Sequence, residues 1–211
     1  MSSSESAVEH VLDTPFFHRW LTAAAASVTR EAPRLTDLDS AIGDADHGTN
    51  MQRGFAAVTD ALDKEPPGSP GAALILAGRQ MISKVGGASG PLYGTLLRRA
   101  GKALGDAEEV TPQQLSDALR AGVDAVAQLG GAAPGDKTML DALIPAVEAL
   151  GAGTGTFTAA GEAAEKGALA TVPMLARKGR ASYLGERSVG HQDPGATSSA
   201  MIIAALAEAA R

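Results

Sequence analysis

Apolar residues recur every three or four positions along most of this chain, which is the spacing of an amphipathic helix. The clearest stretch spans 111–129. It opens with Thr111-Pro112-Gln113-Gln114, which offers an N-cap, a proline suited to the first turn and a glutamine that closes a capping box. The apolar positions that follow form one stripe: Leu115, Leu119, Val123, Val126 and Leu129. No segment shows the strict alternation of a half-buried strand.

Glycine and proline divide the chain into eight such segments. Thr14 is predicted to cap the first helix, and Pro33 is predicted to end it near Glu31. Because the connections are short, neighbouring helices should run antiparallel, which predicts an all-α fold. Neither a repeat nor a long linker divides the chain, so residues 1–211 are expected to form one domain, with 1–13 flexible. The expected helices are 14–31, 47–62, 71–84, 91–104, 111–129, 136–150, 158–178 and 193–206.

The composition excludes several classes of function and says less about the fold. The chain has 211 residues, no cysteine and a net charge of −6. The lack of cysteine excludes disulfides, zinc thiolate sites, iron–sulfur clusters and thiol nucleophiles. The negative charge and the lack of a Lys/Arg run argue against binding to nucleic acid. Because we find no secretory signal and no apolar run long enough to span a membrane, we expect a cytoplasmic protein with no membrane partner.

An acidic cluster is the first candidate for chemistry. Asp39, Asp44 and Asp46 lie close together in DLDSAIGDADHGTNM, which we interpret as a loop leading into a helix. On a continuous helix Asp44 would point away from the other two, but a turn at Gly43 could bring all three together. Three adjacent carboxylates repel one another, and a hard cation such as Mg²⁺ relieves that repulsion. The alternative is that these residues are helix caps and solvated loop residues, with Asp46 capping the second helix.

Two further segments could bind an anion. His47-Gly48-Thr49-Asn50 stands at a predicted helix start, where backbone N–H groups can receive phosphate oxygens, although His47 could equally be a capping histidine. The turn 86–91 precedes another helix and could form an anion cradle, or it could simply join two close helices. It is not a P-loop, because G-x-x-x-x-G-K-[ST] does not occur, and no strand precedes it as a dinucleotide fingerprint requires.

Two later segments complete the candidates. In 130–139, Met139 could form one wall of a base pocket or fill the core, and Lys137 could neutralise phosphate or be solvated. Asp136 is expected to cap the sixth helix. The stretch 180–196 is predicted to be a long polar loop, of the kind that often forms a binding segment or a lid. There, Arg187 could contact a nucleotide and Asp193-Pro194-Gly195 could present backbone groups, whereas a flexible connector is the alternative that we favour for His191.

Four motifs carry a resemblance to a known family. They are GDADHGTNM (43–51), GGASGPLYGT (86–95), PGDKTMLDAL (134–143) and RASYLGERSVGHQDPGATS (180–198). In this order they resemble the nucleotide-binding L subunit of dihydroxyacetone kinase, in its phosphotransferase-system-dependent type. Ala88 departs from the family pattern, in which serine is common at this position.

The resemblance implies an eight-helix, barrel-like bundle with ADP or ATP and two Mg²⁺ ions at one end. It implies that Asp39, Asp44 and Asp46 bind the metal. It assigns no catalytic residue to this chain. The residues that match the nucleotide contacts of the family are His47, Gly48, Thr49, Asn50, Ala88, Ser89, Gly130, Met139, Arg187, Asp193, Pro194 and Gly195.

The resemblance also implies a phosphotransferase, a glycerone kinase subunit with two partner subunits. The K subunit would hold dihydroxyacetone, and a phosphohistidine on the M subunit would recharge the bound ADP. Two alternatives stay open. One is a kinase subunit that uses exchangeable ATP on another small ketose, and the other is a nucleotide-sensing module that acts on a regulator. The sequence leaves the oligomeric state open, with a homodimer as one option.

Overall fold

The computed structural model describes residues 11–152 and 156–211, and the helices of this part confirm the predicted all-α class. Two short strands, β1 (Leu12–Asp13) and β2 (Glu109–Val110), pair antiparallel, with Leu12 opposite Val110. The helices are α1 (Thr14–Ile42), α2 (His47–Lys64), α3 (Pro70–Lys84), α4 (Ser89–Leu104), α5 (Pro112–Gly130), α6 (Leu140–Leu150), α7 (Phe157–Ala170), the 3-10 helix η1 (Arg180–Ser188) and α8 (Pro194–Ala209).

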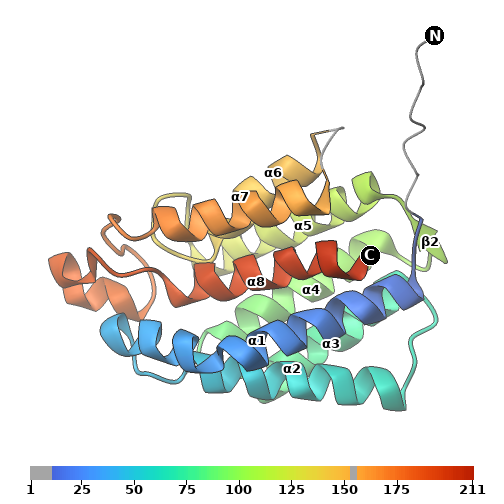
Figure 1. Cartoon of the computed structure of the whole chain (residues 1–211), viewed down its shortest axis with the longest axis horizontal. Helices are drawn as coiled ribbons and strands as arrows, with labels where there is room; N and C mark the ends of the chain where they lie inside the picture. The colour runs from blue at the N-terminus through green and yellow to red at the C-terminus, as the bar shows by residue number, and fades with distance from the viewer. Residues whose placement is uncertain (1–10, 153–155) are drawn as a thin grey trace, which may run out of the picture.

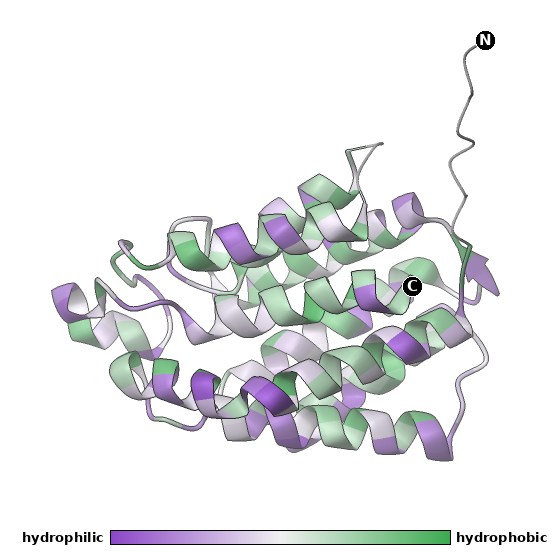
Figure 2. Cartoon of the chain, in the orientation of Figure 1, coloured by the Kyte–Doolittle hydropathy of each residue, from purple (hydrophilic) through white to green (hydrophobic). Residues whose placement is uncertain are grey.

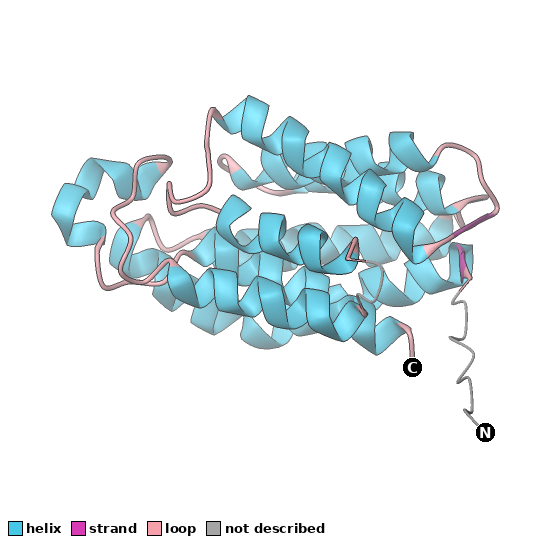
Figure 3. Cartoon of the chain, turned by 90° about the horizontal axis from the view of Figure 1, so that it is seen from above, coloured by secondary structure: helices cyan, strands magenta, loops and turns pink. Residues whose placement is uncertain are grey.

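Consecutive α-helices pack against each other, and α8 packs against α1, so the first and last helices are also neighbours (Figure 1). The odd-numbered helices run toward one end of the bundle and the even-numbered helices start there. The loops 43–46, 85–88, 131–139 and 171–193 gather at this end together with η1, and we call it the loop end. The C-terminus and the two strands lie at the opposite end (Figure 3).

Helix α1 continues through Pro33 to Ile42, so its predicted end before Pro33 is wrong. Proline inside a helix costs about 3 kcal/mol, because it has no N–H to donate and its ring crowds the preceding turn. Packing offsets this cost, since Leu35 is fully buried and Ala32 is almost so. The Thr36 hydroxyl also donates to the Ala32 carbonyl at 3.0 Å. The extra turns matter because they carry Asp39.

One predicted helix cap is confirmed and another is wrong. The capping box at Thr111 and Gln114 is confirmed in both directions. Helix α1 is capped by Asp13, whose carboxylate accepts from the Phe16 N–H, and not by Thr14 as predicted. The expected flexible segment 1–13 falls mostly outside the described residues, and its last two residues belong to β1.

Two predicted boundaries in the second half are wrong. Helix α6 starts at Leu140, because the Asp136 carboxylate binds the Ala133 N–H at 2.8 Å inside the preceding loop instead of capping the helix. Helix α7 ends at Ala170 and does not reach Lys178. The predicted polar loop 180–196 contains η1, whose helical path is interrupted at Gly185, where φ is 55°.

The core is continuous and rich in small residues. Trp20 is fully buried, and its indole N–H donates to the Ile202 carbonyl at 2.8 Å, which ties α1 to α8. Figure 2 shows that α8 is mostly pale or hydrophobic, in keeping with a sequence whose only charged residue is Glu208. Among the described residues, none of the helices combines the length and the hydropathy that a membrane span requires.

Candidate functional site

The loop end contains a cavity of about 410 Å³. Its size falls in the range of roughly 300–1,000 Å³ that is usual for small-molecule sites. The first residues of α2, α4, α6 and α8 line it, together with the last turn of α5 and the start of η1. Because four helices present their N-termini to one space, their dipoles give it a positive potential.

Three carboxylates converge at this cavity. Asp39 lies in the last turn of α1 and not on a loop as predicted, whereas Asp44 and Asp46 lie in the connection to α2. One oxygen from each of the three carboxylates lies within 4.8 Å of the others. The helix does break at Gly43, as predicted. A Cβ there would lie 2.0 Å from an Asp39 carboxylate oxygen, so only glycine lets the chain pass so closely.

The backbone of the next turn fixes Asp39. Its Oδ2 accepts from the N–H groups of Asp46 at 2.9 Å and His47 at 3.1 Å. Asp46 is the N-cap residue of α2, but its side chain makes no capping bond, so its predicted capping role is wrong. The carboxylate of Asp39 instead takes this role from the neighbouring helix.

An arginine on η1 balances part of this charge. Arg180 pairs with Asp44 at 3.0 Å, and both side chains are partly exposed. Exposed pairs of this kind contribute at most about 1 kcal/mol. A cation that binds the three carboxylates can therefore replace this contact at low cost.

Helix capping differs between the two ends of the bundle. At the end opposite the cavity, α1, α3, α5 and α7 each have an N-cap side chain that accepts from the first turn: Asp13, Ser69, Thr111 and Thr156. At the loop end only α8 has such a cap from its own N-cap residue. The first N–H of α2 is bound by Asp39 and that of α6 by the Thr138 hydroxyl at 3.2 Å, whereas the N-cap residue of α4 makes no side-chain bond. Uncapped first turns leave N–H groups for another acceptor. The cavity is therefore suited to an anion.

A buried hydroxyl network lies beneath the cavity. The ring of His47 contacts Ser198 Oγ through Nε2 at 2.8 Å and Ser89 Oγ through Nδ1 at 3.3 Å. Burial lowers the pKa of His47 below its ordinary value, although the carboxylates of Asp39 and Asp46 oppose this effect. Burial raises the pKa of Tyr93 above its ordinary value, so its hydroxyl stays protonated at neutral pH.

One wall of the cavity is apolar. Met139 is buried and lines the cavity together with Leu92 and Val126, so it belongs both to the core and to the cavity wall. Leu129 is 56% exposed although it continues the apolar stripe of α5, because it reaches the cavity mouth beside Gly130. This wall suits a flat apolar group such as a nucleobase.

Lys137 is buried, so of the two alternatives left open by the sequence, the solvated lysine is wrong. Its Nζ donates to the carbonyls of Met174 at 3.1 Å and Ser188 at 2.6 Å. Burial lowers the pKa of Lys137, and the charge of Asp193 opposes this effect. Met174 precedes η1 and Ser188 is its last residue, so the lysine ties the approach to η1 and its end to the loop before α6.

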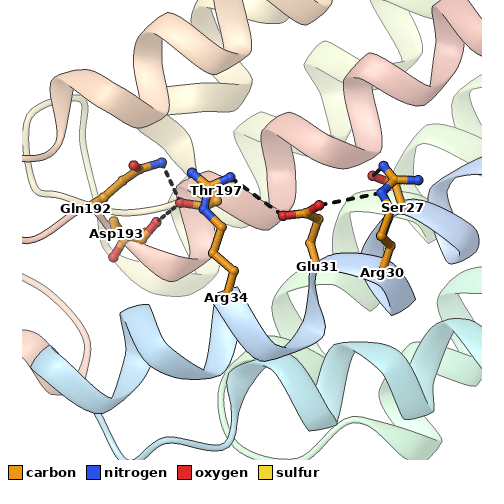
Figure 4. Close-up of polar contacts among 7 residues, drawn as sticks. All are labelled: Ser27, Arg30, Glu31, Arg34, Gln192, Asp193 and Thr197. Carbon is orange, nitrogen blue, oxygen red and sulfur yellow. Dashed lines mark hydrogen bonds and ion pairs between the residues drawn. The ribbon is translucent and has the colours of Figure 1, made fainter.

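Asp193 caps α8 as the sequence allowed, with its carboxylate accepting from the Ala196 N–H at 2.7 Å. Burial raises the pKa of Asp193 to about 7, with that hydrogen bond opposing the rise. The backbone carbonyl of Asp193 accepts from the Thr197 hydroxyl, whose oxygen accepts from the side-chain amide of Gln192 (Figure 4). Figure 4 also shows the neighbouring side chains along α1: Ser27, Arg30, Glu31 and Arg34.

The buried carboxyl predicts a pH dependence for the ligand-free protein. The pKa of Asp193 is about 7 in the folded state against an ordinary 3.8, so folding favours its protonated form. That stabilisation is complete below about pH 4 and is lost as the pH rises toward 7. Urea unfolding at pH 5 and pH 8 should therefore show wild type losing stability relative to Asp193→Asn as the pH rises. An equal change in both proteins would contradict the prediction.

The sequence candidates divide into two groups by position. Those that line the cavity, besides the three aspartates, are His47, Ala88, Ser89, Gly130, Met139, Asp193, Pro194 and Gly195. Those that do not line it are Gly48, Thr49, Asn50 and Arg187. Gly48 packs tightly on α1, since a Cβ there would lie 2.0 Å from the Ala32 carbonyl oxygen. Arg187 is exposed on η1.

Residues 41–208 match the DAK2 domain. This chain belongs to the DAK2 domain family. It is 46% identical over 199 residues to the ADP-binding subunit DhaL of the PEP-dependent dihydroxyacetone kinase of Escherichia coli K12, covering 91% of this chain and 95% of that protein. It is 43% identical to the L-erythrulose 1-kinase of Mycolicibacterium smegmatis, covering 82% of this chain but 32% of the enzyme.

Solved structures agree with this membership. The DAK2 domain superposes on the dihydroxyacetone kinase of C. freundii with a TM-score of 0.74 at 27% identity, covering 99% of this chain. It spans 37% of that enzyme's length. A second structure of the same enzyme, in complex with AMP-PNP and Mg²⁺, gives a TM-score of 0.71.

Sequence reasoning missed several residues around the site of this DAK2 domain. Tyr93 falls in the predicted helix 91–104, and Ser198 and Ser199 fall in the predicted helix 193–206, but none of the three was a candidate site residue. Two adjacent serines inside an otherwise apolar helix were the available signal, because buried hydroxyls need partners. Arg180 gave no such signal, since its contact with Asp44 depends on the path of η1.

Proposed function

We propose that this chain is the ADP- and Mg²⁺-binding subunit of a dihydroxyacetone kinase. It would relay a phosphoryl group from a phosphohistidine donor subunit to dihydroxyacetone held on a partner subunit. One observation carries the proposal: three carboxylates converge beside helix N-termini whose own N-cap residues make no side-chain bond. The name of the E. coli relative, a DhaL subunit that binds ADP, supports the same assignment.

The carboxylate cluster fits a hard cation. Asp39, Asp44 and Asp46 would hold Mg²⁺, in the proposed number of two, because carboxylate oxygens are its preferred protein ligands. When bound, the metal would neutralise charge on the transferring phosphoryl group. The protein prepares these ligands in advance, since two backbone N–H groups hold Asp39.

The cavity suits a nucleoside diphosphate. The start of α4 and the N–H groups of α2 that Asp39 does not bind would receive phosphate oxygens, with donors that need no reorganisation. The apolar wall would hold the base. We propose that the candidates lining the cavity contact the nucleotide: His47, Ala88, Ser89, Gly130, Met139, Asp193, Pro194 and Gly195. The assignment of Gly48, Thr49, Asn50 and Arg187, which do not line it, rests on the family resemblance alone.

In this proposal the chain orients and retains the nucleotide, and none of its residues is assigned as a general base. Activation of the acceptor hydroxyl falls to the K subunit that holds dihydroxyacetone. The phosphohistidine of the M subunit would reach the nucleotide from the same open end of the bundle, where η1 and the loops lie.

A second candidate is a kinase that uses exchangeable ATP on another small ketose. The 43% identity to an L-erythrulose 1-kinase favours it, although this chain matches only 32% of that enzyme. The two functions differ in how long the nucleotide stays bound.

Nucleotide retention tests the proposal directly. The purified chain is expected to bind ADP in the presence of Mg²⁺ in isothermal titration calorimetry, and to lose that affinity in EDTA. Mass analysis after gel filtration is expected to find ADP still bound, whereas an empty chain that readily binds ATP would favour the second candidate. If no nucleotide binds with Mg²⁺ present, both are wrong.

A further inference from the structure

We propose that Tyr93 and Ser198 are positioning residues that fix His47 in its neutral Nε2–H tautomer and thereby hold the starts of α2, α4 and α8 together. The consequence for nucleotide binding rests on the proposed function. The tautomer itself is a property of the ligand-free protein and can be measured without any ligand.

Four contacts of 2.9 Å or less link these residues, and Ser198 Oγ also approaches the carbonyl oxygens of Pro194 at 3.1 Å and Gly195 at 3.3 Å. Tyr93 on α4 is 1% exposed, and its hydroxyl oxygen lies 2.9 Å from the carbonyl oxygen of Gly195. The same oxygen lies 2.7 Å from Ser198 Oγ and 2.8 Å from Ser199 Oγ. Ser198 Oγ lies 2.8 Å from Nε2 of His47. Both serines are fully buried, so water does not take the place of these partners.

Counting protons assigns directions to the four short contacts, which are shorter than the approaches of Ser198 to the Pro194 and Gly195 carbonyls. Each of the four needs one hydrogen. The three hydroxyls supply three hydrogens, and the Gly195 carbonyl supplies none. For all four to be hydrogen bonds, the fourth must come from Nε2 of His47. Tyr93 donates to Gly195 and accepts from both serines, and Ser198 accepts from the histidine.

The other tautomer would be costly here. If Nδ1 carried the proton, one of the four contacts would join two lone pairs at 2.9 Å or less. A buried polar group without a hydrogen bond costs about 1–3 kcal/mol, which corresponds to roughly a fivefold to 150-fold preference. The assigned tautomer leaves the Nδ1 lone pair facing Ser89, whose hydroxyl can donate to it.

The network joins the starts of α2, α4 and α8, all of which line the cavity. His47 is the first residue of α2, Ser89 is the first residue of α4, and Gly195 is the second residue of α8. The three starts can contact one ligand together only while they keep their relative positions. Ser198 does not line the cavity, and Tyr93 lines it with its hydroxyl bound to α8, so both residues position the site and do not react.

Nuclear magnetic resonance of the ligand-free protein tests the tautomer. The two ring nitrogens of a neutral imidazole differ strongly in ¹⁵N shift, so long-range ¹H–¹⁵N spectra reveal which one carries the proton. The chain has four histidines, and a His47→Gln variant identifies the signal. At pH 8 the wild type is expected to carry the proton on Nε2. A proton on Nδ1 would overturn the proposal.

Two matched variants separate positioning from stability. Tyr93→Phe frees the Ser198 hydroxyl to donate to His47 or to the Pro194 carbonyl 3.1 Å away, so the Nδ1–H tautomer is expected to appear beside the Nε2–H tautomer. Ser199→Ala removes a bond to the same tyrosine oxygen, yet Ser198 must still donate to that oxygen, so the tautomer should not change. Both variants are expected to lower the melting temperature by a few degrees.

Calorimetry with Mg–ADP completes the test. Tyr93→Phe is expected to raise the Kd about tenfold, which is about 1.4 kcal/mol, and Ser199→Ala less than threefold. If the two variants match in tautomer and in Kd, the network has only a structural role and the proposal is wrong. A wild type that fails to bind Mg–ADP would refute the proposed function, while the tautomer spectra would still decide this inference.

Discussion

Asp44→Asn is expected to weaken Mg²⁺-dependent ADP binding about 100-fold, or about 2.8 kcal/mol. The substitution keeps the size of the side chain and removes one of three charges whose oxygens lie within 4.8 Å of one another. An amide oxygen is a poor replacement for a carboxylate on Mg²⁺. Titration calorimetry with and without Mg²⁺ measures the effect, and circular dichroism should show unchanged helix content because Asp44 is exposed.

The matched control is Arg180→Met. Asp44 pairs with Arg180, so removal of either residue breaks the same contact. If Asp44 served only that ion pair, the two variants would weaken binding alike. If Asp44 binds the metal, removal of the neighbouring positive charge leaves Mg²⁺ affinity equal or higher, and the two variants differ in sign. Equal losses would therefore contradict the metal assignment.

The loop end combines two opposite sources of charge, the carboxylate cluster and the helix N-termini. Three carboxylates in one place are unfavourable, and four helix N-termini around the same cavity are suited to negative charge. An anion alone would be repelled by the aspartates, and a cation alone by the helix dipoles. A metal–diphosphate complex satisfies both. This explains why we expect the metal and the nucleotide to bind cooperatively.

The fold class followed from periodicity, but the boundaries depended on tertiary contacts. The capping box at Thr111 was predictable because both of its partners lie within four residues. The path of α1 through Pro33 was not, because the packing of Leu35 against distant helices offsets the local cost. The 3-10 helix η1 was missed for the same reason, since the approach to it and its end are held by Lys137 from an earlier loop.

The candidate site was predictable where it rests on short motifs. Asp39, Asp44 and Asp46 drew attention by their spacing, and the break at Gly43 indicated how they could meet. Which helix each would occupy was less clear, and Asp39 was wrongly placed on a loop. Tyr93 could not be found, because its partners lie more than 100 residues away on α8.

Lys137→Met is expected to lower the free energy of unfolding by about 2–4 kcal/mol. Methionine keeps the length of the side chain but leaves the carbonyls of Met174 and Ser188 without their donor. For a domain of this size the melting temperature should fall by roughly 5–15 °C. The segment 171–190 should also open more often. Limited proteolysis with trypsin measures this opening, because Arg177, Lys178 and Arg187 lie within the segment.

The control is Lys166→Met, the same substitution at an exposed position of α7. It changes the net charge equally but removes no buried hydrogen bond, so its stability and cleavage pattern should match wild type. If cleavage of the Lys137 variant begins elsewhere in the chain, the lysine stabilises the whole bundle and does not specifically hold η1. If both variants resist trypsin alike, the buried ammonium does not tie down η1. Selective cleavage in 171–190 would instead mean that one charge keeps Arg180 beside the carboxylate cluster.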